Sequence, residues 1–489
     1  MRNNSPYRYV RVCLKSVVFL LTVTCFAFET QASVKLPRIF GNDMILQRDV
    51  ETPIWGWASP GERVTVDICE QRQSVVADET GKWSVELEPQ PAGGPFEMTV
   101  SASNTIKFTD VYFGDVWICA GQSNVSFPLK RSQDAKSTIE TANYPRFRFI
   151  TVRSTSADEP QNNISGKWEV CSPKTTPDLS AIAYYFGQYL QTELSVPIGV
   201  IVVASSNSTC EAWVEREKLA KTQSLAPLIE EERLAKATST QRAGAVFNGM
   251  ISPICPYAIK GVVMYQGESN ASRAYQYRSL FKQLILSWRE KWGDQTFPFI
   301  YVQLPNFMAS RDEPSSSAWA ELREAQHLAL TLPNTYEVVT IDVGDANDLQ
   351  PKNKKTVGVR LANVALAKVY DKDAPWTGPE FKSAEIVDDK IIITFDHAEG
   401  GLVASENSQS DGTTLFGFAI AGSDRKFYWA DAEIFEENKV ILTSPDVPRP
   451  VAARYAWADN PICNLTNTVG LPASLFRTDD WPGVTHDAR

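Results

Sequence analysis

Residues 111–124 read VYFGDVWICAGQSN, and this stretch decides the fold class of the chain. Residues 111–119 form a nearly continuous apolar run, which is typical of a strand buried on both faces inside a parallel sheet. The run breaks at Ala120-Gly121, and Gln122, Ser123 and Asn124 follow directly. Because ligands of open α/β sheets bind beyond the carboxyl ends of the strands, these polar side chains mark a candidate site.

The same pattern recurs further along the chain. More apolar runs lie at residues 197–204, 259–265, 297–304 and 338–343. Amphipathic stretches that predict helices lie at residues 181–194, 275–292, 319–332 and 357–370. Strands that alternate with helices predict an α/β domain with a doubly wound, mainly parallel sheet, here over residues 111–371.

Regions of β character flank this domain on both sides. Residues 63–68, 82–87 and 96–100 alternate apolar and polar side chains between turns rich in Pro and Gly. This predicts a small immunoglobulin-like sandwich over residues 33–110. Short strand candidates return after residue 372, so a second β domain is expected over residues 372–489.

The N-terminus has the pattern of a cleaved secretory signal over residues 1–32. Basic residues up to Lys15 precede an apolar run at residues 16–28, and small residues precede Ser33. The alternative is an anchoring helix, but the run is shorter than the ~20 residues that span a bilayer. We therefore expect an exported protein, secreted or periplasmic, without stable membrane insertion.

Charge and cysteine content argue against two classes of partner. With 48 Lys and Arg against 58 Asp and Glu, the net charge is −10, which disfavours nucleic acid as a partner. The cysteine spacing matches no zinc pattern and contains no C-x-x-C, so no metal is expected. Export permits disulfides, but the sequence assigns no pairs, and cysteines within apolar runs are equally compatible with buried free thiols.

Ser123 has the features of a nucleophile. It follows a glycine directly after a strand, at a predicted helix N-terminus where the helix dipole and free backbone N–H groups stabilise an oxyanion. Val125 stands where the G-x-S-x-G motif of α/β-hydrolases has its second glycine, so that motif is absent. The alternative role for Ser123 is a helix N-cap.

Two more strand ends carry polar side chains. Residues 265–270, YQGESN, place the amide of Gln266 and the carboxylate of Glu268 at one of them. Residues 342–351, DVGDANDLQP, crowd three aspartates at another, which is costly without a partner or a task. The alternatives are ordinary polar loops or a calcium site, although the aspartate spacing matches no known calcium loop.

With these motifs the chain resembles the bacterial sialate O-acetylesterases of the SGNH-hydrolase superfamily, over nearly all of its length after residue 33. The resemblance is carried by a set of motifs: Asp43-Met44-Ile45-Leu46-Gln47, Gly121-Gln122-Ser123-Asn124, Tyr265-Gln266-Gly267-Glu268-Ser269-Asn270, Leu322-Arg323-Glu324-Ala325-Gln326 and Gly358-Val359-Arg360-Leu361-Ala362. It implies an SGNH-type doubly wound sheet between the two β domains. It also implies hydrolysis of acetyl esters on sialic acid or a related carbohydrate.

The resemblance implies the roles of individual residues. Ser123 attacks the acetyl group, and backbone N–H groups near Ser123 together with the Gln266 amide hold the oxyanion. A histidine steered by an acidic residue takes the serine proton, and no metal or organic cofactor takes part. The acidic residue stays open among three candidates, Asp348, Asp345 and Glu268. The other residues expected to line the site are Gln122, Asn124, Trp213 and Tyr265.

The chain departs from the family at the histidine. The family has Asp-Ile-His-Pro where this chain has Asp348-Leu349-Gln350-Pro351. A glutamine amide has no pKa near neutrality, so Gln350 can orient a hydroxyl but cannot take its proton. Loss of one triad member costs several powers of ten in rate. The histidines of the chain are not expected to replace the base, since they fall in a helix, in the C-terminal β domain and in the tail: His327, His397 and His486.

A second departure lies at the oxyanion hole. The family has Trp-Gly-Gly before Glu-Ala-Trp, and this chain has Ser205-Ser206-Asn207 before Glu211-Ala212-Trp213. A glycine lets its backbone N–H approach an oxyanion closely. Asn207 is therefore either an obstacle or, because asparagine tolerates the same backbone, a donor in place of the glycine.

Two functions remain open: a slow or altered esterase, and a carbohydrate-binding protein that uses the same pocket without turnover. In the second, aromatic side chains stack on a sugar, and core packing is the alternative role of the candidates Trp117, Trp213, Tyr265 and Trp319. An arginine would meet a sialic acid carboxylate, with the candidates Arg131, Arg273 and Arg360. A purely structural role is the third hypothesis, and the sequence makes no prediction of the oligomeric state.

Overall fold

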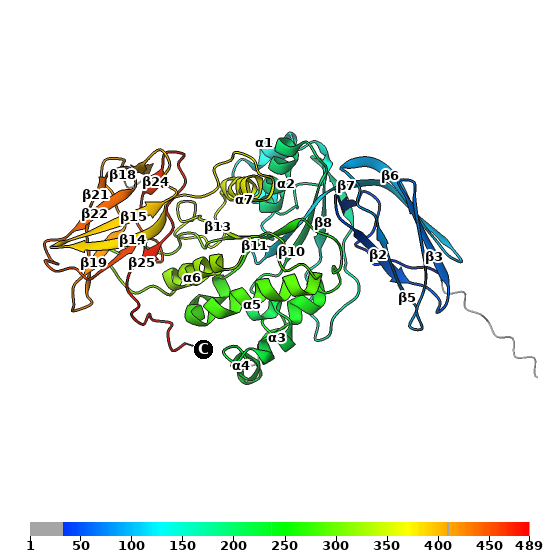
Figure 1. Cartoon of the computed structure of the whole chain (residues 1–489), viewed down its shortest axis with the longest axis horizontal. Helices are drawn as coiled ribbons and strands as arrows, with labels where there is room; N and C mark the ends of the chain where they lie inside the picture. Colours follow the sequence, from blue (N-terminus) through cyan, green and yellow to red (C-terminus); the bar gives the residue numbers. More distant parts are fainter. Residues whose placement is uncertain (1–32, 236, 408–409, 489) are drawn as a thin grey trace, which may run out of the picture.

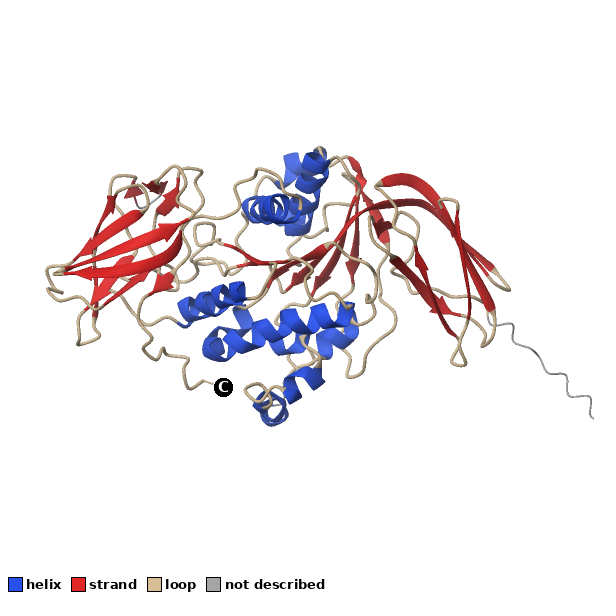
Figure 2. Cartoon of the chain, in the orientation of Figure 1, coloured by secondary structure: helices blue, strands red, loops and turns tan. Residues whose placement is uncertain are grey.

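The computed structural model describes residues 33–235, 237–407 and 410–488, so the predicted signal of residues 1–32 lies outside the described residues. Figure 1 shows three regions in a row: an N-terminal β region, a central α/β region and a C-terminal β region. The central region holds a large sheet with helices on both sides (Figure 2). Among the described residues, no helix is long and apolar enough to cross a bilayer.

The central sheet has the strand order β13-β12-β11-β7-β10-β8-β9. Neighbouring strands are parallel except β8 and the edge strand β9, which pair antiparallel. The bounds are β7 (Thr105–Gly121), β8 (Tyr144–Val152), β9 (Trp168–Cys171), β10 (Ile198–Ala204), β11 (Gly261–Tyr265), β12 (Phe299–Val302) and β13 (Thr335–Val338). The prediction of a mainly parallel α/β sheet is confirmed, and burial of both faces explains the continuous apolar runs.

Helices cover both faces of this sheet. In Figure 1, one side carries α1 (Ala135–Glu140), α2 (Ala181–Leu194) and α7 (Lys354–Val369), and the other carries α3 (Arg216–Lys221), α4 (Pro227–Ala235), α5 (Ala274–Trp292) and α6 (Ala318–His327). Short helical turns are η1 (Leu129–Arg131), η2 (Cys210–Trp213), η3 (Phe247–Ile251), η4 (Glu268–Arg273) and η5 (Leu328–Thr331). Three helices, α2, α6 and α7, begin at side-chain caps: Ser180, Ser317 and Asn353 each accept from a backbone N–H in the first turn.

Strand β7 belongs to two regions at once. Its first half pairs with β6 (Gly93–Ser101) and β1 (Ile45–Gln47), and its second half pairs with β10 and β11. The boundary predicted between residues 110 and 111 therefore falls inside a continuous strand, at Asp110, whose φ is 59°. The other N-terminal strands are β2 (Thr52–Trp57), β3 (Arg63–Ile68), β4 (Gln71–Val76) and β5 (Lys82–Leu87). An immunoglobulin-like topology for this region stays a prediction.

The C-terminal region is built of antiparallel strands around its own core. One sheet has the order β14-β15-β22-β21, a second has the order β20-β19-β23-β25, and β16–β24 and β17–β18 form short pairs. The bounds are β14 (Glu380–Val387), β15 (Lys390–Asp396), β16 (Leu402–Ala404), β17 (Glu406–Asn407), β18 (Ser410–Asp411), β19 (Phe418–Ala421), β20 (Phe427–Trp429), β21 (Asp431–Phe435), β22 (Lys439–Thr443), β23 (Ala452–Tyr455), β24 (Leu465–Asn467) and β25 (Phe476–Arg477). Ile393, Phe418 and Leu442 are among its buried core residues.

Two predicted elements differ in the structure. The strand expected at residues 338–343 lies earlier, at β13, and an irregular loop leads from there to α7. The helix expected after Ser123 is absent: Val125 and Ser126 donate to the Gln122 carbonyl, and the chain then extends. A residue before proline avoids the helical conformation, so Phe127, which precedes Pro128, cannot continue the turn.

None of the six described cysteines forms a disulfide. Cys119, Cys171 and Cys210 are buried, and Cys119 is a small core residue of the apolar run at residues 111–119, as expected for a buried thiol there. Burial raises the pKa of Cys119 and of Cys171 to about 12, so both thiols stay protonated at neutral pH.

Candidate active site

Three strand ends meet at one edge of the central sheet. Gly121 pairs with Ala204 on one side and with Tyr265 on the other, so the loops that follow β7, β10 and β11 start side by side. Gly121 has a φ of 150°, and a Cβ there would lie 2.0 Å from the Tyr265 carbonyl oxygen. A glycine is therefore required where the chain turns from β7 into residues 122–126.

Ser123 lies at the top of this turn, half-buried, with Gln122 beneath it. Gln122 is 2 % exposed and bonds to both neighbouring loops. Its Nε2 donates to the Ser208 carbonyl at 2.5 Å and to Ser269 Oγ at 2.7 Å, and its Oε1 accepts from Gly267 N at 3.2 Å. Gln122 was expected to line the site, but the structure places it below, where it fixes three loops to one another.

Asn124 connects the serine turn to the loop that carries Gln350. Its Nδ2 donates to Glu268 Oε1 at 2.7 Å and to the Leu349 carbonyl at 3.1 Å. Its Oδ1 accepts from Lys354 Nζ at 2.5 Å. The residue next to Ser123 therefore brings together Glu268, the loop of Asp348 and Gln350, and the first turn of α7.

Lys354 is a residue of this site that the sequence analysis missed. It is fully buried, and its ammonium lies over the rings of Phe127 at 5.0 Å and of Tyr265 at 5.8 Å. Burial lowers the pKa of Lys354 to about 7, against the opposing effect of Glu268 and Asp348. Its signal in the sequence was its spacing from Val357 and Leu361, which puts it on the buried face of α7.

Glu268 faces Lys354 across Asn124 and lies in the same buried network. Burial raises the pKa of the Glu268 carboxyl, against hydrogen bonds and the nearby Lys354 charge that favour its ionised form. Its Oε2 is buried and has no hydrogen-bond partner among the described residues. A carboxyl with one oxygen bound and the other free can hold or release a proton inside the site.

The aspartates of the last loop do not form a cluster. Asp342 pairs with Arg360 at 2.6 Å, the exposed Asp345 accepts from Asn347 N, and Asp348 accepts from Gln350 N at 2.8 Å. Within the described residues, no group of three or more His, Cys, Asp and Glu side chains could hold a metal ion. Of the acidic candidates, Asp348 and Glu268 therefore lie within the network around Asn124, and Asp345 does not.

The three histidines make their contacts elsewhere. His327 Nδ1 lies 3.0 Å from Glu337 Oε2. Burial lowers the pKa of His327, but Glu337, Glu380 and Glu324 together outweigh burial, so the pKa is raised. The ring of His397 packs on Trp376 and that of His486 on Tyr275. Among the described residues, no imidazole contacts Ser123, and the side chain of Gln350 makes no hydrogen bond.

Asn207 takes the left-handed conformation that a glycine would adopt, with a φ of 57°. It is exposed, and Ser206 Oγ of the same loop lies 3.4 Å from Ser126 Oγ of the serine turn. In the part of the chain that the structure describes, the backbone N–H groups of Ser123 and Asn207 have no hydrogen-bond partner. Two free N–H groups on facing loops are the donor set that an oxyanion needs.

Gln266 lies deeper than Asn207, at 1 % exposure. Its Oε1 accepts from Tyr277 OH at 2.6 Å, and its Nε2 donates to Asn270 Oδ1 at 3.2 Å. Asn270 in turn donates to Glu211, which pairs with Arg273 at 2.6 Å. Gln266 thus supports the loops from below, and an oxyanion role for its amide stays a prediction.

The arginine and aromatic candidates separate clearly. Arg273 and Arg360 pair with carboxylates, whereas the exposed Arg131 stacks on Phe127 and has no ion pair among the described residues.

The expectation that Trp213 and Tyr265 line a sugar site by stacking is wrong, because they are 0 % and 2 % exposed. The same holds for two other candidates, Trp117 and Trp319, at 0 % and 4 %. Each indole N–H donates to a group inside the protein: that of Trp117 to Tyr370 OH, that of Trp213 to Ser208 Oγ and that of Trp319 to the Pro305 carbonyl.

Comparison with known proteins identifies the family of the chain. Residues 113–367 match the family described as carbohydrate esterase, sialic acid-specific acetylesterase. The sialate O-acetylesterase of Mus musculus is 28% identical over 94% of this chain and 97% of its own length, and that of Pongo abelii is 29% identical over 90% and 92%. A carbohydrate acetylesterase of Xanthomonas citri superposes with a TM-score of 0.84 at 36% identity, over 92% of this chain and 100% of that one. The chain therefore belongs to the family of sialic acid-specific carbohydrate acetylesterases, which are carboxylic ester hydrolases.

Proposed function

We propose that this chain removes acetyl groups from sialic acid or a related carbohydrate with Ser123 as nucleophile, and that it does so slowly because Gln350 replaces the base. The observation that carries the proposal is the position of Asn124. It bonds to Glu268 and to the Leu349 carbonyl at once, so the serine turn and the loop of Gln350 share one site.

In the proposed reaction, Ser123 Oγ attacks the acetyl carbonyl carbon, and the backbone N–H groups of Ser123 and Asn207 bind the oxyanion. The C–O bond to the sugar then breaks, the sugar oxygen takes a proton, and water releases acetate from the acyl-serine. In the family a histidine moves these protons. Here the Gln350 amide has no accessible pKa, so solvent takes the Ser123 proton, and the rate is low.

Arg131 is the proposed partner of the sugar carboxylate. It is exposed on η1, stacks on Phe127 at 4.9 Å and has no carboxylate partner among the described residues. A free guanidinium binds a carboxylate through two parallel N–H donors. The ammonium of Lys354 lies over the same Phe127 ring, and this contact supports a role for Arg131 at the border of the site.

The second candidate function is carbohydrate binding without turnover. Gln350 favours it, since an amide at the position of the base keeps polar contact with a hydroxyl and removes proton transfer. We further infer that residues 1–32 direct export, from the basic and apolar segments of that stretch.

Acetate release from an O-acetylated sialic acid and from an aryl acetate tests the proposal. The expected wild-type rate is low but above that of buffer, and Ser123→Ala reduces it to the buffer rate. The exposed Ser423→Ala on the C-terminal region is the matched control and keeps the wild-type rate. Tight sugar binding with no acetate release in any variant favours the second candidate. Fast wild-type turnover that Ser123→Ala abolishes shows that another base serves Ser123.

A further inference from the structure

A cavity of about 500 Å³ lies away from Ser123, between the C-terminal β region and the central region. Its walls come from β19 and β20, from residues 313–316 ahead of α6 and from residues 481–484 of the C-terminal tail. None of the residues around Ser123 lines it. The cavity is large enough for one or two sugar rings.

Aromatic side chains dominate one wall of this cavity. Phe427 and Trp429 are two residues apart on β20, so their side chains point to the same face of the strand. Trp429 is 40% exposed. The residue paired with Trp429 on β19 is Ala419, whose small side chain leaves the indole uncovered. Trp481 of the tail lies 5.6 Å from the Phe427 ring and closes the wall. Of these rings, Trp429 is the exposed one, and an exposed indole binds the apolar face of a sugar ring.

A free guanidinium stands beside these rings. Arg425 precedes β20 and lies over Trp481 at 5.3 Å. Arg454 also lines the cavity, but Asp479 binds it through both carboxylate oxygens at 2.8 Å. Arg425 is exposed, and among the described residues its side chain has no hydrogen bond or ion pair. The cavity therefore contains stacking surfaces together with one guanidinium whose donors are available.

The acidic residues of the cavity do not cancel this charge. The Glu321 carboxylate accepts from Val484 N at 2.6 Å and from Thr485 N at 3.0 Å, so the tail satisfies it. Glu313 is the other acidic residue of the lining, and the same lining contains the cations Arg425 and Lys426. An anion with an apolar ring face therefore fits this cavity better than a neutral or cationic ligand.

We propose that this cavity is a second carbohydrate-binding site, which takes an acidic sugar unit by stacking on Trp429 and by pairing its carboxylate with Arg425. The sugar class follows from the family of the chain, and the acid follows from the free guanidinium. The segment between β12 and α6 links the two sites. Met308 N donates to the Ala346 carbonyl in the loop of Gln350, and residues 313–316 form the wall of the cavity.

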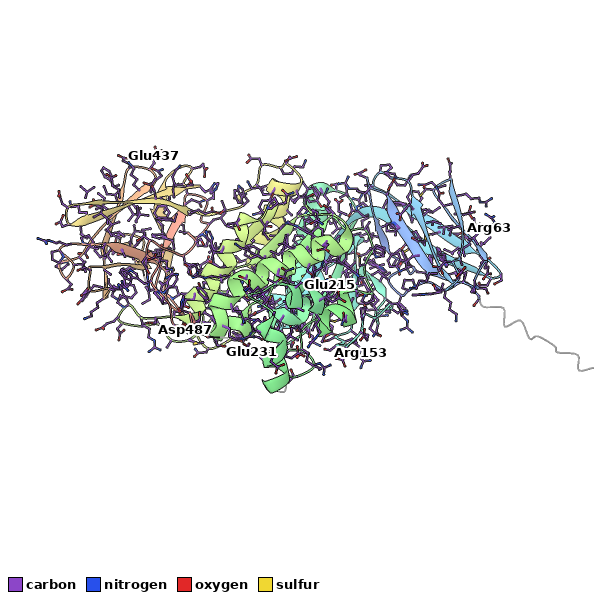
Figure 3. The ribbon with its side chains drawn as sticks, turned by 60° about the horizontal axis from the view of Figure 1, so that its bottom comes forward. Arg63, Arg153, Glu215, Glu231, Glu437 and Asp487 are labelled. Carbon is purple, nitrogen blue, oxygen red and sulfur yellow. The ribbon has the colours of Figure 1, made fainter. Side chains whose placement is uncertain are left out.

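Calorimetric titration of the full chain tests the proposal. All variants carry Ser123→Ala, so that no ester is turned over. The probes are N-acetylneuraminic acid and its methyl ester, which share the ring and differ in the charge. Added changes are Arg425→Gln and Trp429→Ala, and Arg63→Gln is the matched control. Arg63 is exposed on β3 at the opposite end of the molecule (Figure 3).

The expected result separates ring from charge. Arg425→Gln weakens binding of the acid about tenfold and leaves the ester unchanged, because it removes only the paired donors. Trp429→Ala weakens both probes, and Arg63→Gln changes neither. Unfolding temperatures equal to that of the parent show that the variants fold.

Two outcomes overturn the proposal. If the acid and its ester bind with equal affinity, Arg425 does not pair with the carboxylate. If neither Arg425→Gln nor Trp429→Ala changes the affinities, the sugar does not bind in this cavity. The proposed esterase function fails independently, since its readout is acetate release by the chain with Ser123 intact.

Discussion

Restoring an imidazole at residue 350 is the sharpest test of the reaction proposed for this chain. Gln350→His keeps the hydrogen bonds of the loop, because they use its main-chain atoms. The backbone N–H of Gln350 donates to Asp348 Oδ1, and the backbone carbonyl of Leu349 accepts from Asn124 Nδ2. An imidazole there has Asp348 two residues away to orient it and stabilise its protonated form. The variant is expected to gain acetate release.

The size of the gain follows from what a base contributes. Removal of a triad histidine in an evolved serine hydrolase costs on the order of 10⁶ in kcat, and positioned acid–base catalysis contributes about 10² to 10⁴. Asp348 is already bound to the Gln350 N–H, so the support of the new imidazole is incomplete. We expect a gain of about 10² to 10⁴ in kcat/KM, which corresponds to about 3 to 5 kcal/mol of transition-state stabilisation.

The pH profile identifies the new base. An imidazole accepts the Ser123 proton only when it is neutral, so the rate of Gln350→His rises through an apparent pKa of about 6.5 and then levels. The wild type lacks this step. The measurement is acetate release from an aryl acetate at a series of pH values, with Ser123→Ala added to Gln350→His as the control. A folded Gln350→His variant that releases acetate no faster than wild type refutes the assignment of residue 350 as the position of the base.

Three further predictions concern the frame of the site. Because the pKa of Lys354 is lowered to about 7, the folded chain lacks a proton that the unfolded chain binds between pH 7 and 10.5. The free energy of unfolding of the wild type should therefore rise across this pH range relative to that of Lys354→Met. Urea unfolding at several pH values measures the difference. Gly121→Ala should cost more than about 3 kcal/mol or prevent folding, because its Cβ would lie 2.0 Å from the Tyr265 carbonyl, whereas Gly61→Ala, with no atom within 4 Å, should cost about 1 kcal/mol. Asn207→Gly keeps the backbone donor and should change acetate release by Gln350→His less than about tenfold, and a larger loss would assign the donor to the Asn207 side chain.

Elements with local signals were predicted closely. Helix α2 spans Ala181–Leu194, the range expected from its periodicity, because Ser180 caps its start and the chain turns left-handed at Ser195. The strands β3 and β5 were also found at their expected bounds, since each alternates buried and exposed residues between tight turns. In these elements the neighbours in sequence decide the structure.

Strand β8 was missed because its support is not local. Its sequence, YPRFRFITV, contains arginines where a buried strand should be apolar. Arg148 is nearly buried, and it pairs with Asp43 and Asp110 and stacks on Tyr112. Only the folded chain brings these partners to Arg148, so no window of sequence around β8 reveals that its charge is satisfied.

The same distinction applies to the candidate site. Ser123, Glu268 and Gln350 were predicted to meet because parallel strands end at one edge of a sheet. In the structure, Asn124 beside Ser123 donates to Glu268 and to the carbonyl of Leu349, the residue before Gln350. Lys354 was missed because its burial depends on Asn124, far away in the sequence. The aromatic candidates were wrong because the sequence around a tryptophan does not show whether its side chain points into the core or into the site.

Under the proposed mechanism, the hydrogen bonds around Ser123 explain how the fold can persist without a base at residue 350. Gln122 and Asn124 fix the serine turn to the neighbouring loops through Ser208, Gly267, Glu268 and Leu349, and none of these contacts uses the side chain of Gln350. Residue 350 can therefore change identity while the nucleophile and the oxyanion donors stay in place. Under the proposed mechanism the fold depends on that frame and the rate depends on one side chain outside it, so the variants proposed here can change the rate and leave the fold intact.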